Sequence, residues 1–175
     1  MKFLRWILPL LVIYRTMLAS DWPQWRGPNR DGVWTETGIR SSFPATGLVP
    51  NWKAAVGFGY SSPIIASGKL YLSDLVVEKT NVHERVSCFD ARSGKRVWQT
   101  QHETFPPDWF FNPEQMRGPG ATPVIHNGRV YAISMFMTLE CFDARTGAVI
   151  WKHELTTEYQ LPPSSLDASP LVDGN

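Results

Sequence analysis

The residues of this chain that could do chemistry include four histidines, and their spacing supports no metal centre. Metal sites usually place histidines or cysteines a few residues apart, as in H-E-x-x-H or C-x-x-C. The sequence also lacks a G-x-S-x-G nucleophile motif, a phosphate-binding P-loop and a dinucleotide-binding glycine motif. We therefore predict no catalytic residue and no metal ligand. The histidines are His83, His102, His126 and His153.

The two cysteines, Cys88 and Cys141, occupy equivalent positions in two copies of a repeated segment. Equivalent positions in adjacent stacked units should lie beyond disulfide reach, which ends at a Cα separation of about 7 Å. In an oxidising compartment we expect both to be small buried apolar residues. A disulfide bridge or a reactive thiol is the alternative.

A better candidate for function is the segment 101–120, which is long for a connection in a compact fold. It contains Trp109, Phe110, Glu114 and Arg117, and aromatic residues with arginine dominate binding hot spots. The alternative is that its aromatic residues pack beneath their own loop as a small satellite core.

The elements that must position these residues come from an internal repeat. Residues 88–98 read C-F-D-A-R-S-G-K-R-V-W, and residues 141–151 read C-F-D-A-R-T-G-A-V-I-W, 53 residues later. In each copy an aspartate can accept hydrogen bonds from turn N–H groups, and a glycine can adopt the left-handed conformation that closes the turn. A tryptophan follows, suited to packing between successive units. The repeat positions are Asp90, Gly94, Trp98, Asp143, Gly147 and Trp151, with Trp52 46 residues before Trp98.

The repeat extends upstream, because residues 62–72 match residues 122–132 as strand, glycine turn, strand. One unit is therefore four short strands in sequential order, apolar on both faces, as expected of sheets stacked between sheets. Such units are the blades of a β-propeller. We predict an all-β partial propeller of four-stranded antiparallel blades, with two full blades, a closing strand at Trp52 and the start of a third blade.

The motif S/T-P-x-x-x-x-G-x-x-Y, followed by a Phe-Asp strand and A-x-x-G-x-x-x-W, resembles the pyrroloquinoline-quinone (PQQ)-like, or quinoprotein, propeller repeat. Residues 21–32, D-W-P-Q-W-R-G-P-N-R-D-G, look like the opening of secreted bacterial members of that family. The resemblance covers roughly residues 21–175. The adjacent cysteine pair of quinoprotein alcohol dehydrogenases is missing from this stretch, as is a recognisable calcium and quinone ligand set.

The chain divides into three predicted parts. Residues 1–20 have a basic start, a short apolar run and a small-residue end, as in a signal peptide; an uncleaved anchor is the alternative. Residues 21–50 form an N-terminal arm, whose Trp22, Trp25 and Arg26 could bind a ligand or simply anchor the arm. Residues 51–175 form the incomplete propeller, with blades at about 60–101 and 121–155 and a new blade from 168. The chain is then a fragment, and we expect residues 21–175 alone to associate.

Connections in a propeller alternate between two ends, so the predicted long loops at residues 74–84, 101–120 and 156–167 should share one face. Besides the 101–120 residues, Tyr159 and Asp167 belong to this long-loop face. The net charge is +1, or −2 without the leader, which favours neither nucleic acid nor an anionic membrane surface.

We predict a non-catalytic, periplasmic or extracellular bacterial scaffold that binds a protein or extracellular ligand, with no transmembrane span after signal cleavage. No cofactor is predicted. The alternative is a fragment of a PQQ-dependent alcohol or sugar dehydrogenase that holds PQQ and calcium.

Overall fold

The structure is a computed structural model that describes residues 20–79, 81–106, 108–112, 117–162 and 166–174. The predicted signal peptide, except for Ser20, lies outside these residues. Within them, no helix is both long and apolar enough to cross a membrane.

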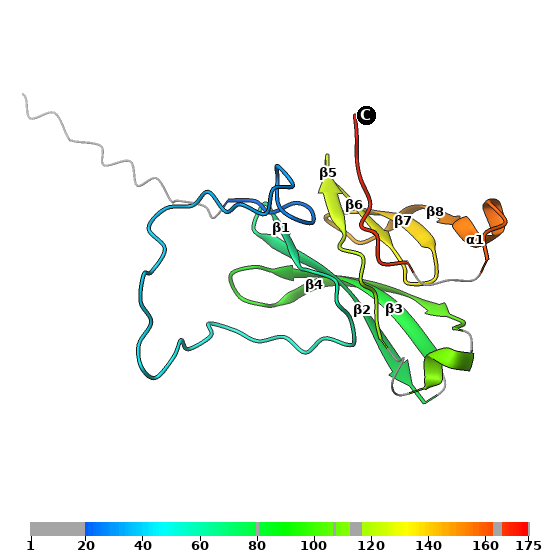
Figure 1. Cartoon of the computed structure of the whole chain (residues 1–175), viewed down its shortest axis with the longest axis horizontal. Helices are drawn as coiled ribbons and strands as arrows, with labels where there is room; N and C mark the ends of the chain where they lie inside the picture. Colours follow the sequence, from blue (N-terminus) through cyan, green and yellow to red (C-terminus); the bar gives the residue numbers. More distant parts are fainter. Residues whose placement is uncertain (1–19, 80, 107, 113–116, 163–165, 175) are drawn as a thin grey trace, which may run out of the picture.

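Two four-stranded antiparallel sheets make up the fold, each with its strands in sequential order (Figure 1). The all-β prediction of four-stranded antiparallel blades is confirmed. Two short helices, η1 (Asp108–Phe111) and α1 (Leu155–Glu158), follow the sheets. The first sheet contains β1 (Ile64–Ala66), β2 (Lys69–Glu78), β3 (Asn81–Asp90) and β4 (Arg96–Thr104). The second contains β5 (Val124–His126), β6 (Arg129–Ile133), β7 (Thr138–Asp143) and β8 (Val149–Glu154).

The two copies of the sequence repeat pair their strands in the same register. In the first sheet Tyr71 pairs with Cys88, which pairs with Trp98. In the second sheet the row is Tyr131, Cys141 and Trp151. Each third strand has a register shift directly after its cysteine, so both turns begin from the same local geometry.

The main core lies between the two sheets. It joins Tyr71, Cys88 and Trp98 of the first sheet to Val130 and Phe142 of the second, and all five are buried. We call the contact between the two sheets the seam. A second cluster, made of Leu75, Val82, Phe110 and Met135, lies further along it. Burial of these apolar side chains from both sheets holds one sheet against the next.

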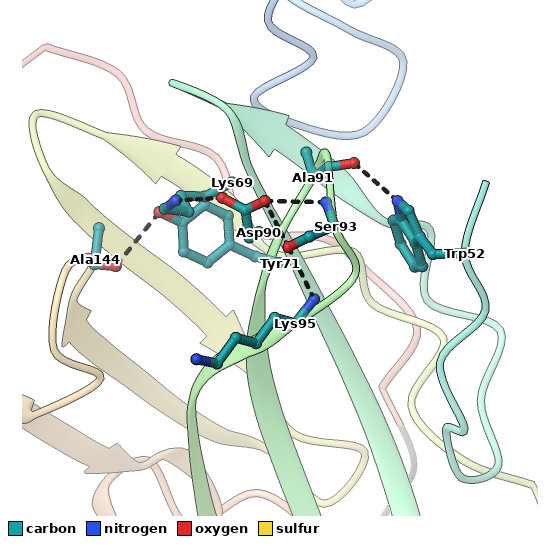
Figure 2. Close-up of polar contacts among 8 residues, drawn as sticks. All are labelled: Trp52, Lys69, Tyr71, Asp90, Ala91, Ser93, Lys95 and Ala144. Atoms are coloured by element: carbon teal, nitrogen blue, oxygen red, sulfur yellow. Dashed lines mark hydrogen bonds and ion pairs between the residues drawn. The ribbon is translucent and has the colours of Figure 1, made fainter.

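Tryptophans fix the spacing between units. The Trp98 Nε1 donates to the Ala144 carbonyl oxygen at 2.9 Å, and its ring lies where a Cβ on Gly147 would sit 2.5 Å away. Trp52 repeats the contact one unit earlier: its Nε1 donates to Ala91 at 3.0 Å, and its ring faces Gly94 (Figure 2).

The structure differs from the sequence pattern in its strand bounds. Residues 51–57 form no strand, although a closing strand was expected at Trp52; Phe58 instead makes an isolated bridge to Leu75. Residues 74–84, read as a long loop, lie mostly in β2 and β3, because the β-branched residues Val76, Val77 and Val82 extend both strands. Residues 168–174 also form no strand.

Candidate functional site

The N-terminal arm begins against the first strand of each sheet, β1 and β5. Trp22 and Ile65 exchange two backbone hydrogen bonds of 2.7 and 3.0 Å. The Ile125 N–H donates to the Pro23 carbonyl at 2.9 Å, so the arm bridges β1 and β5 (Figure 1). The Ser67 N–H donates to the Asp21 carboxylate at 2.9 Å. These contacts fix the start of the next loop.

Residues 24–32 turn tightly through four left-handed positions. Arg26 and Arg30 have φ of 63° and 58°, and Gly27 and Gly32 have φ of 80° and 74°. A Cβ on Gly27 would sit 2.7 Å from the Trp22 ring, so only glycine allows this approach. Left-handed arginines are uncommon and costly, and such strain gathers at functional sites.

The turn holds both arginine side chains in place. Arg30 donates from Nε and Nη2 to the Gln24 Oε1 at 3.0 and 2.8 Å. The Arg26 guanidinium carbon lies 5.7 Å from the centroid of the Trp25 ring, within cation–π range. Arg26 Nη2 also donates to the Asp31 carbonyl at 3.3 Å. Two guanidinium groups are therefore oriented before any ligand arrives.

These residues form one wall of a cavity of about 660 Å³, which we call the arm pocket. The opposite wall comes from the end of the 101–120 connection and from the C-terminal segment, which runs beside β5 (Figure 1). The Thr122 N–H donates to the Ser169 hydroxyl at 2.9 Å and ties the two segments of this wall together. The lining residues are Gln24, Trp25, Arg26, Arg30, Gly120, Asp167, Ala168, Ser169, Pro170 and Leu171.

The arm pocket has the chemistry of a binding site for anionic groups. Arg26 and Arg30 carry two positive charges against the single carboxylate of Asp167. Trp25 is 54% exposed and Leu171 is 63% exposed, so apolar contact surface lies beside the charge. Arginine with an aromatic neighbour suits a carboxylate next to an apolar group.

The arm pocket does not fit calcium. Calcium takes six to eight oxygen ligands, generally several of them carboxylates. Asp167 is the only carboxylate among the described residues that line it, and two guanidinium groups face the same space. Elsewhere among the described residues, no group of three or more His, Cys, Asp or Glu side chains is arranged to hold a metal ion.

The residues predicted for the long-loop face differ in their burial. Phe110 is fully buried against Leu75, Val82 and Met135, so it is part of the core and cannot contact a ligand. Phe111, beside it, is 40% exposed. The Trp109 side chain and Glu114 lie outside the described residues. Phe110 therefore lies in a core cluster and not on the predicted binding face.

The other three candidates lie at the surface. Asp167 lines the arm pocket, packed so closely that a Cβ on Gly120 would sit 2.4 Å from its Oδ1. Arg117 is exposed and Tyr159 is 67% exposed, but neither lines this pocket. Sequence reasoning considered Trp25 and Arg26 mainly as anchors and missed Arg30. The signal that could have found it was two arginines among turn-forming Pro, Asn and Gly.

The repeat aspartates are structural. Asp90 Oδ1 accepts from the Ser93 N–H and hydroxyl at 3.0 and 2.9 Å, and Lys69 pairs with Oδ2 at 2.9 Å (Figure 2). The Lys69 bond and then the Ser93 bonds hold the pKa of Asp90 well below its usual range. Asp143 accepts from the Thr146 hydroxyl and N–H, which also lower its pKa.

Both cysteines are free and buried. Burial raises the pKa of the Cys88 thiol to about 11, and burial likewise raises that of Cys141. A thiol held protonated is a poor nucleophile. This agrees with the interpretation of both as small core residues.

Comparison with known proteins places the chain among PQQ-like repeat proteins. The family described as outer membrane protein assembly factor BamB matches residues 82–175, more than half of the chain. A curated relative is the 1-butanol dehydrogenase (cytochrome c) of Thauera butanivorans, 25% identical over 180 residues. The alignment covers 95% of this chain but only 24% of that enzyme, so the chain spans about a quarter of its relative's length.

Solved structures of quinoproteins and of BamB are also similar. A europium-containing methanol dehydrogenase matches with a TM-score of 0.45 and 15% identity, over 69% of this chain and 19% of that one. The quinohemoprotein alcohol dehydrogenase of Comamonas testosteroni matches with 0.39 and 20%, over 58% and 14%. BamB of Moraxella catarrhalis matches with 0.29 and 20%, over 56% and 35%.

Proposed function

We propose that this chain, which belongs to the outer membrane protein assembly factor BamB family of PQQ-like repeat proteins, is part of a non-catalytic scaffold that binds another protein through the arm pocket. The family description names an assembly factor, and assembly requires protein–protein contact. The observation that carries the proposal is the pair of preoriented guanidinium groups, Arg26 and Arg30, beside the exposed Trp25.

The chemistry of the pocket indicates the kind of segment it would take. Two guanidinium groups favour a carboxylate, since arginine forms paired hydrogen bonds with carboxylate oxygens. Trp25 and Leu171 favour an apolar side chain next to it. An acidic peptide with an apolar neighbour therefore fits both walls. Gly120 and Asp167, at the ends of the predicted loops 101–120 and 156–167, both line the arm pocket. The proposed binding surface therefore includes part of the predicted long-loop face.

The proposal also includes a location. The signal-peptide pattern of residues 1–20 directs the chain out of the cytoplasm. We place the scaffold in the periplasm or outside a bacterial cell, where it would meet its partner.

Isothermal titration with a hexaglutamate peptide, with and without one added tryptophan, tests the proposed binding. We expect wild-type protein to bind the tryptophan-containing peptide more tightly and to bind hexalysine not at all. Arg26→Ala should weaken binding at least fivefold, and the weakening should disappear at high salt because charges are screened there. Arg92→Ala, at an exposed position in a repeat turn, is the matched control. Equal binding by wild-type protein and Arg26→Ala would reject the arm pocket.

A second candidate function is a part of a PQQ-dependent dehydrogenase. The alignment with the 1-butanol dehydrogenase over 95% of this chain favours it. The arm pocket offers no calcium ligand set, so no catalytic step is assigned to its residues. Adding PQQ and Ca²⁺ and following dye-linked oxidation of 1-butanol separates the two functions. Turnover that depends on PQQ would support the dehydrogenase and contradict the scaffold.

A further inference from the structure

A small cavity, separate from the arm pocket, lies in the seam between the two sheets. Its volume is about 10 Å³, close to that of one water-sized sphere. Its polar lining residues are Ser73, Glu84, Arg85, Thr100 and His102 from the first sheet, Glu140 from β7, and Ser134 directly after β6. We call it the seam cavity. Two carboxylates, three hydroxyls, one guanidinium and one imidazole line it, in a region that is otherwise an apolar core.

Two side-chain atoms of residues that line the seam cavity have no hydrogen-bond partner among the described residues. Glu84 is 4% exposed, and its Oε2 accepts at 2.9 Å from the N–H of Met135, in the turn between β6 and β7. Its Oε1 is buried and unpaired, and so is the hydroxyl oxygen of Ser73, which is 5% exposed. An unpaired buried polar group is costly. Two of them facing one water-sized space point to a bound water.

The charges around Glu84 do not neutralise it. Arg85, on the same strand, is engaged by Asp74 of β2 with 2.7 Å between Nε and Oδ1. His102 of β4 pairs through Nδ1 with Oε2 of Glu140 on β7 at 3.1 Å. The Lys152–Glu154 pair of β8 lies beyond, with 2.7 Å between its charged atoms. An ionised Glu84 would therefore be a second carboxylate beside Glu140 in a seam with one imidazole.

We propose that the seam cavity binds one water molecule and one proton: Glu84 is protonated on Oε1 and donates to the water, and the water donates to the Ser73 hydroxyl. Both orphaned atoms then have partners. Loss of the proton leaves two carboxylates facing each other across the seam. Ionisation of Glu84 therefore loosens the contact between the first and second sheets.

The pKa values of the neighbouring groups agree with this arrangement. Burial raises the pKa of Glu84 to about 7, although the Met135 N–H opposes the shift. A folded-state pKa above the ordinary 4.5 means that the folded chain binds more protons than the unfolded chain between about pH 4.5 and 7. This contribution to stability is present at low pH and is lost as pH rises through that window. Burial lowers the pKa of His102, but the hydrogen bond and charge of Glu140 outweigh burial and raise it above the ordinary value of 6.5. His102 therefore also contributes stability that is lost as pH rises above 6.5.

Glu84→Gln tests the proposal in the full chain. The carboxamide keeps the acceptor for Met135 and always presents a donor to the cavity, as a protonated carboxyl does. For wild-type protein, the ratio of folded to unfolded molecules should fall by up to about tenfold per pH unit between pH 5 and 7. Glu84→Gln should remove that part of the slope and leave the part due to His102. Glu103→Gln, at an exposed position on β4, is the matched control and should keep the wild-type slope.

A second measurement keeps the test valid if Glu84→Gln does not fold. Infrared spectra of the wild-type protein should show the carbonyl stretch of a protonated carboxylic acid at pH 6, and this band should vanish as pH rises to 8. Ser73→Ala removes the acceptor of the water and should move the midpoint of that loss. A pH slope unchanged in Glu84→Gln, or the absence of the band at pH 6, would overturn the proposal.

Discussion

The indole Nε1 of Trp98 lies 2.9 Å from the carbonyl oxygen of Ala144, so the last strand of one sheet is bonded to the closing turn of the next. Tyr71 donates to the same oxygen at 3.3 Å, and Thr100 donates to the Gly147 carbonyl at 2.6 Å. The turn of the second sheet is thus held by three side chains from the first.

Trp98→Ala should destabilise the protein by about 3–5 kcal/mol, because it removes a large buried ring from the seam. Trp151→Ala changes the equivalent residue of the second sheet, where the ring is only partly buried. It should cost no more than about 2 kcal/mol, since less apolar area is lost. Urea unfolding of both variants measures the difference. Equal losses would contradict the assignment of Trp98 to the contact between sheets.

Gly147→Ala should cost more than Gly128→Ala, although the two glycines have nearly the same φ, 74° and 72°. An alanine in either left-handed position costs about 1–2 kcal/mol. At Gly147 the new Cβ would also sit 2.5 Å from the Trp98 ring, whereas at Gly128 no atom of the described residues lies within 4 Å. We expect the clash to add about 1–3 kcal/mol. The comparison isolates the clash with Trp98, and no excess loss at Gly147 would show that the ring can move away.

The repeat was predictable because its residues are chemically distinctive and keep the same offsets within each copy. An aspartate, a glycine and a tryptophan at fixed offsets define one turn and one contact, and Asp143, Gly147 and Trp98 lie in that contact. The full lengths of β2 and β3 were not predictable, because Asp74, Glu84 and Arg85 made the segment look like a polar loop. Arg85 pairs with Asp74 across the two strands, so the charges of these two residues are satisfied inside the sheet.

Acid should weaken the repeat turns. The pKa of Asp143 is lowered by the Thr146 hydroxyl and N–H, so its contribution is present above the ordinary value of 3.8 and is lost as pH falls through the lower, folded value. Asp143→Asn keeps an acceptor but does not titrate. Its melting temperature should therefore change less than that of wild-type protein between about pH 4 and pH 2. Parallel curves for the two proteins would assign the acid loss to other carboxylates.

The position of the arm could not be predicted, because backbone groups hold it. Trp22 and Ile65 exchange main-chain hydrogen bonds, and Pro23 accepts one from Ile125. Such bonds leave no side-chain pattern in the sequence. The arm pocket follows from them, since they bring Arg26 and Arg30 opposite Asp167, more than 130 residues later.

Gly120→Ala should move Asp167 out of the arm pocket. The new Cβ would sit 2.4 Å from the Asp167 Oδ1, and the glycine does not have the left-handed φ that would itself strain an alanine. Displacing this carboxylate makes the pocket more positive, so the hexaglutamate peptide should bind more tightly, by a few-fold. Asp167→Asn is the companion variant, because it removes the charge without the clash. Weaker binding by both variants would mean that Asp167 contacts the ligand directly.

The most direct test of the proposed function is to map hexaglutamate binding onto the chain by ¹H–¹⁵N NMR. If the arm pocket is the binding site, amide shifts should be concentrated at residues 24–32 and 166–171, and should saturate at the affinity found by calorimetry. The same titration of Arg26→Ala should show them reduced. Shifts concentrated at residues 101–112 or 155–162, with the arm unchanged, would contradict the proposal and favour another surface.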